Sequence, residues 1–206
     1  MPTEAPLPPI SLLTICGLSE LGDHGQRAVT HVLSILDPEV PDPADFDAYD
    51  AHHRMTLRFH DAIEPSGTVE LPTPEHVDAI LAFGQALHEP EPRDDLHLLV
   101  HCHMGISRST AAMAMLLAQA APHEDEDAIL GRILATREKA WPNSRMIGFA
   151  DERLGRDGRL TAAVGRLYAR QLARSPEIAT FMNANARSHE VAMAAVGARE
   201  LGLMTP

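Results

Sequence analysis

The residues best suited to chemistry lie in one short stretch, HCHMGISRS, at positions 101–109. An apolar run of strand length at 96–100 precedes it, and an apolar helical run at 109–118 follows it. The pattern predicts a buried strand, a tight turn, and a helix that begins at Arg108. The first N–H groups of a helix are unpaired and carry a partial positive charge, so this turn can bind an anion. Gly105 allows the backbone to adopt a positive φ beside that anion.

The side chains of this stretch add a nucleophile to the predicted anion site. Cys102 lies at the base of the turn, where the helix dipole and cationic or hydrogen-bonding neighbours such as His101 favour its thiolate. A thiolate that faces a phosphate site is a nucleophile directed at phosphorus. The Ser109 hydroxyl can donate to this sulfur and help it leave, and the Arg108 guanidinium can donate to two phosphate oxygens. The predicted phosphate-binding residues are His103, Met104, Gly105, Ile106, Ser107 and Arg108.

Two other interpretations of the stretch have less support. Cys102 could be a small buried core thiol, but the anion-binding turn and Arg108 argue against this. The run His101, Cys102 and His103 could bind a metal, but ligands at three consecutive positions would strain the local geometry. Because the chain also lacks zinc-binding motifs, we expect neither a metal nor another cofactor.

A phosphate ester also needs an acid that protonates the leaving group, and a carboxylic acid is the usual source. In a parallel sheet, sites form at the carboxyl ends of the strands. Asp61 follows a predicted strand and is the first candidate, Asp37 is the second, and Glu64 is the third. The alternative for Asp61 is a side chain that only shapes its loop. Asp94 and Asp95 precede a strand and would lie roughly 20 Å from the turn, at about 3.3 Å per residue, so we exclude them.

The pattern His-Cys-x5-Arg-Ser at 101–109, with glycine three residues after cysteine, resembles the signature loop of the cysteine-dependent protein tyrosine phosphatase superfamily. Its spacing and short lead-in resemble the dual-specificity branch. In that superfamily the cysteine is the nucleophile, the arginine binds phosphate, and the next hydroxyl assists departure of the thiolate. An aspartate on an earlier loop is the general acid. The resemblance implies these roles for Cys102, Arg108, Ser109 and Asp61.

The resemblance covers roughly residues 10–150, and the segment from Pro142 to Arg159 is similar to small bacterial members. It implies a metal-independent phosphomonoester hydrolase with a phosphocysteine intermediate, and within that class a protein tyrosine or dual-specificity phosphatase. Its substrates would be phosphorylated proteins or small phosphomonoesters. The loop lacks the lysine that relatives use for inositol phosphates. The alternative is a non-catalytic phosphate-binding module, a pseudophosphatase.

The composition restricts partners and location. The chain has 206 residues and a formal net charge of −12, so it lacks the positive charge with which proteins bind nucleic acids or anionic membranes. Its longest apolar run, 111–118, is far shorter than the roughly 20 residues of a transmembrane helix. No secretion signal is visible, so we expect a cytoplasmic protein. Cys16 is expected in the core, with a reversible disulfide to Cys102 as the alternative.

The periodicity predicts an α/β fold with one small, mostly parallel central sheet flanked by helices. Strands are predicted at 12–16, 31–36, 55–59 and 96–100. Helices are predicted at 74–87, 109–118, 124–141, 145–155, 159–174 and 188–202. Residues 1–158 would form the catalytic domain. Residues 159–206 would form a helical C-terminal extension, packed on that domain or extending from it. The sequence leaves open whether this extension covers the sheet or forms a homodimer interface.

Overall fold

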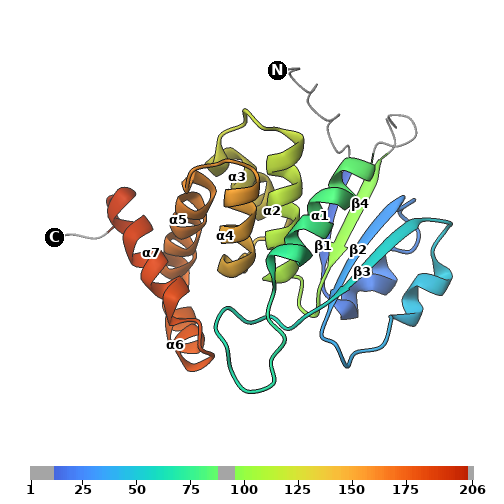
Figure 1. Ribbon diagram of the computed structural model, residues 1–206, viewed down its shortest axis with the longest axis horizontal. Coiled ribbons are helices and arrows are strands. Elements are labelled where there is room, and N and C mark those ends of the chain that lie inside the picture. Colours follow the sequence, from blue (N-terminus) through green and yellow to red (C-terminus); the bar gives the residue numbers. More distant parts are fainter. Residues whose placement is uncertain (1–11, 88–95, 204–206) are drawn as a thin grey trace.

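The computed structural model describes residues 12–87 and 96–203. Its centre is a sheet of four parallel strands in the order β1-β4-β2-β3 (Figure 1). The strands are β1 (Leu12–Cys16), β2 (His31–Leu36), β3 (His53–Arg58) and β4 (His97–His101). The predicted α/β fold with a parallel sheet is confirmed. The central strands β2 and β4 are buried along their whole length, which explains why they lack a polar alternation.

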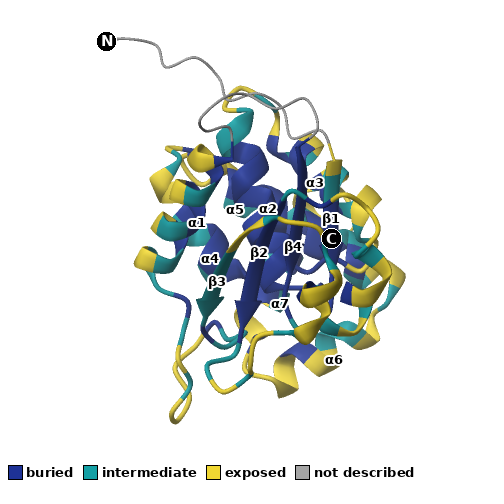
Figure 2. Ribbon diagram, turned by 90° about the vertical axis from the view of Figure 1, so that its right-hand side faces the viewer, coloured by how far each residue is buried: buried dark blue, intermediate teal, exposed yellow. Residues whose placement is uncertain are grey.

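Helices cover the two faces of the sheet unequally (Figures 1 and 2). The α-helices lie on one side of the sheet and form the large apolar core. Two short 3-10 helices, η1 (Leu18–His24) and η2 (Ala44–Ala48), cover the other face with a small cluster around Leu21 and Phe46. The α-helices are α1 (Pro74–Ala86), α2 (Arg108–Ala120), α3 (Glu126–Thr136), α4 (Ser144–Arg153), α5 (Arg159–Arg174), α6 (Glu177–Ala184) and α7 (Ser188–Glu200).

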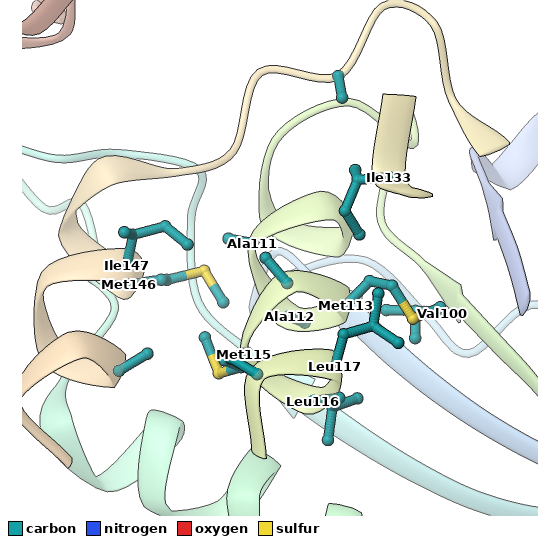
Figure 3. Packing of buried hydrophobic residues seen from close by; sticks show 14 of the residues in the cluster. Val100, Ala111, Ala112, Met113, Met115, Leu116, Leu117, Ile133, Met146 and Ile147 are labelled. Carbon is teal, nitrogen blue, oxygen red and sulfur yellow. The ribbon is translucent and has the colours of Figure 1, made fainter. Parts of the chain in front are cut away.

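Helix α2 lies at the centre of the large core, between the sheet and the outer helices. Every residue from Arg108 to Ala118 is buried. Figure 3 shows Met146 of α4 on one side of α2, and Val100 of β4 and Ile133 of α3 on the other. Close packing on all sides leaves α2 little freedom to move. The N-terminus of α2 therefore has a fixed position directly after β4.

The C-terminal helices pack on the other helices rather than on the sheet (Figure 1). α5 contacts α3 and α4, and α7 lies along α5. The rings of Trp141 and Tyr168 are buried and stacked, with their centroids 4.2 Å apart. This stack joins α5 to the segment before α4. The division of the chain at residue 158 into two domains stays a prediction.

Two helical predictions differ from the structure. Helix α3 ends at Thr136 and does not continue to Trp141, because the backbone leaves the helical region at Arg137, with φ −140° and ψ 92°. The Arg137 guanidinium donates to Glu20 and to the Met104 carbonyl, each at 2.8 Å. Helix α6 was not predicted, since a helix of eight residues is marginal alone and depends on tertiary packing. In the described part of the chain, no helix is both long and apolar enough to cross a membrane.

Candidate active site

The loop between β4 and α2, residues 102–108, turns its carbonyl groups toward the surrounding scaffold. Four carbonyls accept hydrogen bonds from η1, from the segment 137–143 and from α2: those of His103, Met104, Ile106 and Ser107. The C=O and N–H groups of one trans peptide plane point in opposite directions. The N–H groups that follow these carbonyls therefore point into the loop: those of Met104, Gly105, Ser107 and Arg108. Converging N–H groups at a helix N-terminus form an anion-binding site.

Gly105 is required in this loop for two reasons. Its φ is +66°, in the left-handed region that side chains disfavour. A Cβ atom here would also lie 2.5 Å from the carbonyl carbon of Cys16 and 2.7 Å from the nitrogen of Gly17. The 102–108 loop therefore packs directly on the end of β1, which fixes its position relative to the sheet.

Cys102 lies at the base of the loop and is only 2% exposed. Its Sγ lies 3.2 Å from Ser109 Oγ, so these side chains meet as the sequence predicts. His101, the residue before Cys102, is buried and is bound to β2. Its Nε2 lies 2.7 Å from Ser34 Oγ, and burial lowers the pKa of His101 to about 4. His101 is therefore uncharged at neutral pH, so of the two kinds of neighbour expected for Cys102, cationic or hydrogen-bonding, it is not the cationic kind.

The second cysteine, Cys16, lies in a different environment from Cys102. Cys16 belongs to the small cluster under η1 and η2, whereas Cys102 belongs to the large core on the other face of the sheet. Burial raises the pKa of the Cys16 thiol to about 12, which keeps it protonated. This placement supports the interpretation of Cys16 as a core residue.

Arg108 is buried although it is charged, with 2% of its surface exposed. Its Nη1 donates to Asp37 Oδ1 at 2.6 Å and to the Phe59 carbonyl at 2.5 Å. Its Nε has no hydrogen-bond partner among residues 12–87 and 96–203. Leaving a buried guanidinium N–H unpaired costs free energy, so this atom marks a position where an anion would be stabilised. Asp37 holds the guanidinium in place beside that position.

Asp61 follows β3 and is held by donors from three other segments. Its Oδ1 accepts hydrogen bonds from Ser107 Oγ at 2.7 Å and Asn143 Nδ2 at 2.9 Å, and lies 3.4 Å from Arg187 Nη1. Within the described residues, every hydrogen bond to this carboxyl group falls on Oδ1. The other oxygen, Oδ2, is therefore the one that can exchange a proton with a substrate.

Arg187 is in turn fixed by Glu190, at the start of α7. The two form a buried ion pair, with Nε to Oε2 at 2.7 Å and Nη2 to Oε1 at 2.8 Å. Glu190 is fully buried and also accepts hydrogen bonds from Trp141 Nε1 at 2.6 Å and the Ser144 N–H at 3.0 Å. Burial alone would lower the pKa of Arg187, but its hydrogen bonds to Glu190 and the charge of Asp61 raise it. Arg187 therefore remains a cation.

One cavity of about 570 Å³ connects these groups. Its lining includes the 102–108 loop, residues of α6, and the segment between α6 and α7. Two large apolar side chains at the cavity are mostly exposed, Met104 at 67% and Phe181 at 63%. The cavity therefore combines a polar base with an apolar rim. Its lining includes Asp37, Asp61, Cys102, His103, Met104, Ile106, Ser107, Arg108, Trp141, Phe181, Asn185 and Arg187.

The structure thus brings the residues of the predicted loop together with Asp61 and Asp37. Glu64 is exposed and lies in a separate pocket with Arg145 and His189. Asp94 and Asp95, which the sequence excludes, lie outside the described residues.

Three residues of the site were missed from the sequence: Asn143, Arg187 and Glu190. Asn143 follows a proline at the start of α4, where its Oδ1 also caps the helix by accepting from the Met146 N–H. That position could have been recognised as a cap. Arg187 and Glu190 are three residues apart, and oppositely charged residues at this spacing are frequent on exposed helices. The spacing therefore gives no sign that this pair is buried.

Solved structures that match this chain include dual-specificity and tyrosine phosphatases. Human DUSP28 matches with a TM-score of 0.51 at 14% identity, over 70% of this chain and 92% of that chain. DUSP15 matches with a TM-score of 0.51 at 21% identity, over 77% of this chain and 94% of that chain. A mouse putative dual specificity phosphatase matches with a TM-score of 0.50 at 17% identity, over 79% and 96%. No family model and no curated protein matches the sequence. The chain has the fold of the dual-specificity phosphatases.

Proposed function

We propose that this protein is a metal-independent phosphomonoester hydrolase that acts through a phosphocysteine intermediate. Within that class we propose a protein tyrosine or dual-specificity phosphatase. One observation carries the proposal. Cys102 Sγ lies at the base of a loop whose N–H groups converge and whose buried Arg108 has an unpaired Nε. A nucleophile and donors for a tetrahedral anion therefore meet in one cavity.

The reaction takes place in two steps. The Cys102 thiolate attacks phosphorus, and an S–P bond forms as the P–O bond to the leaving group breaks. The N–H groups of the 102–108 loop and the Arg108 guanidinium hold the nonbridging oxygens and stabilise their charge. Water then attacks phosphorus and releases phosphate and the thiolate. Ser109 Oγ, 3.2 Å from the sulfur, donates a hydrogen bond to that thiolate.

Asp61 is the proposed general acid. It protonates the leaving oxygen in the first step and, as a carboxylate, removes a proton from water in the second. Its position at the carboxyl end of β3 and its uncommitted Oδ2 support this role. Asp37 is bound to Arg108, and Glu64 lies outside the cavity, so both are weaker candidates.

The test is turnover of p-nitrophenyl phosphate in the presence of EDTA. We expect activity in the wild type, none with Cys102→Ser, and a loss of about 10²–10⁴-fold with Asp61→Asn. Cys16→Ala is the matched control, because this thiol is buried outside the cavity, and it should retain activity. Loss with Cys102→Ser but not with Asp61→Asn would move the acid to Asp37 or Glu64. A folded, reduced wild type that binds phosphate but hydrolyses nothing would refute the enzyme proposal and leave a phosphate-binding module.

A further inference from the structure

Arg187 stands out among the residues that the proposed reaction does not use. It lies between α6 and α7, more than a hundred residues from Asp61 in sequence, yet it lines the same cavity. Its side chain is only 9% exposed. A buried, always charged side chain is kept only where specific partners stabilise it. The partners of Arg187 therefore indicate its role.

These partners divide into two groups. Glu190 binds the guanidinium in a bidentate manner and fixes its plane. The Nη1–Nη2 edge faces the site, with Nη1 3.4 Å from Asp61 Oδ1 and Nη2 2.9 Å from Ser107 Oγ. Ser107 Oγ, which accepts from Arg187, in turn donates to the same Asp61 Oδ1 at 2.7 Å. Arg187 therefore acts on Asp61 both directly and through Ser107.

We infer that Arg187 is a positioning residue for the proposed general acid: it holds Asp61 Oδ1, and Oδ2 is thereby directed toward the leaving group. The inference rests on the proposed phosphatase function and on Asp61 as its acid. It makes the α6–α7 segment part of the reaction machinery rather than an appendage.

Nearby charges do not favour a different use of Arg187, such as binding a second phosphate. Glu190 balances its charge in the interior, just as Asp37 balances that of Arg108. Each of the two arginines, Arg108 and Arg187, is thus paired with its own carboxylate. Asp61 adds a third carboxylate, which lines the cavity. The cavity has little positive charge beyond what one bound phosphate needs.

The experiment compares two aryl phosphates that differ in how much they need an acid. p-Nitrophenyl phosphate releases a weakly basic phenolate, whereas phenyl phosphate releases a strongly basic one that leaves poorly without a proton. The first variant is Arg187→Gln. Because it leaves Glu190 buried and unpaired, the second is the neutral pair Arg187→Gln/Glu190→Gln, which avoids an isolated buried charge. Arg170→Gln is the matched control, since Arg170 pairs with Asp127 and does not line the cavity.

In each folded Arg187 variant we expect kcat/KM for phenyl phosphate to fall about tenfold more than for p-nitrophenyl phosphate. The inhibition constant of inorganic phosphate should stay within about twofold of the wild type. In an Asp61→Asn background, Arg187→Gln should add little further loss, because the two residues act as one unit. The control Arg170→Gln should behave as the wild type with both substrates.

A merely structural role for Arg187 gives a different result. An equal loss with both substrates, together with a matching rise in the inhibition constant of phosphate, would overturn the inference and assign Arg187 to the support of the 102–108 loop. This result is distinguishable from failure of the proposed function, because in that case the wild type itself would hydrolyse neither ester. If Asp61→Asn showed no dependence on the leaving group in an active enzyme, the acid assignment and this inference would both be rejected.

Discussion

Replacing Glu190 by alanine should destabilise the protein more than the loss of any exposed charge. Glu190 is fully buried and accepts four N–H hydrogen bonds, from Trp141, Ser144 and twice from Arg187. Breaking a buried ion pair by removing one partner costs about 3–5 kcal/mol. The unpaired indole and amide N–H groups would each add about 1 kcal/mol or more if water does not reach them.

These contributions are not additive, and we take about 5 kcal/mol for the whole substitution. For a chain of this length, each kcal/mol lowers Tm by roughly 2–4 °C. Glu190→Ala should therefore lower Tm by about 10–20 °C. Calorimetry or thermal unfolding followed by circular dichroism measures this directly. Glu190→Gln keeps the shape and one acceptor oxygen, so its effect should be clearly smaller.

The matched control is Glu200→Ala on the same helix. Glu200 also pairs with an arginine, Arg166 Nη1 at 2.8 Å, but its side chain is 43% exposed. Partly exposed ion pairs contribute about 0–1 kcal/mol, so Tm should change by only a few degrees. If Glu190→Ala and Glu200→Ala lowered Tm equally, the argument that α7 is held through a buried hydrogen-bonded carboxylate would be refuted.

Three further predictions concern the site. Gly105→Ala would place a methyl group 2.5 Å from the backbone of Cys16, so the 102–108 loop must shift; inhibition by inorganic phosphate should weaken at least about tenfold, and an unchanged inhibition constant would contradict this. His101 has a folded-state pKa of about 4 against its usual 6.5, so the unfolded chain binds the proton first as pH falls. The contribution of His101 to the free energy of unfolding is therefore complete above pH 6.5 and falls by about 3 kcal/mol toward pH 4. Denaturant unfolding should show this fall in the wild type but not in His101→Gln. Phe181→Ala removes an apolar side chain from the cavity rim, so KM for aryl phosphates should rise about fivefold while kcat is retained; a fall in kcat at constant KM would speak against a rim contact.

The 102–108 loop and its flanking strand and helix could be predicted because the residues that form them are adjacent in sequence. The strand, loop and helix around Cys102 follow from apolar runs and from the glycine, and Ser109 lies at the start of the helix that the loop leads into. The central strand β4 follows from its buried apolar run, and the half-exposed β3 follows from its alternation of apolar and polar residues. Asp61 could be selected because the carboxyl ends of parallel strands share one edge of the sheet.

The remaining parts depend on tertiary contacts that no local pattern encodes. Helix α3 ends early, at an Arg137 whose backbone is extended and whose guanidinium is bound to η1 and to the 102–108 loop. The neutral state of His101 depends on burial under η2, where its ring lies 5.5 Å from that of Phe46. Arg187 and Glu190 lie in a segment whose sequence resembles an ordinary surface helix. Only the folded chain shows that they face Asp61 and Trp141.

Trp141 is the only tryptophan in the chain, and it is placed where it can serve as an intrinsic fluorophore for the site. Its indole lines the cavity, stacks on Tyr168 and donates to Glu190. The emission of an indole depends on its hydrogen bond and on the polarity around it. Anion binding and separation of α7 from the cavity can therefore be followed separately from hydrolysis, in the native chain and without a label. Trp141, whose contacts with Tyr168 and Glu190 join the C-terminal helices to the cavity, thus also supplies a fluorescence signal from the cavity.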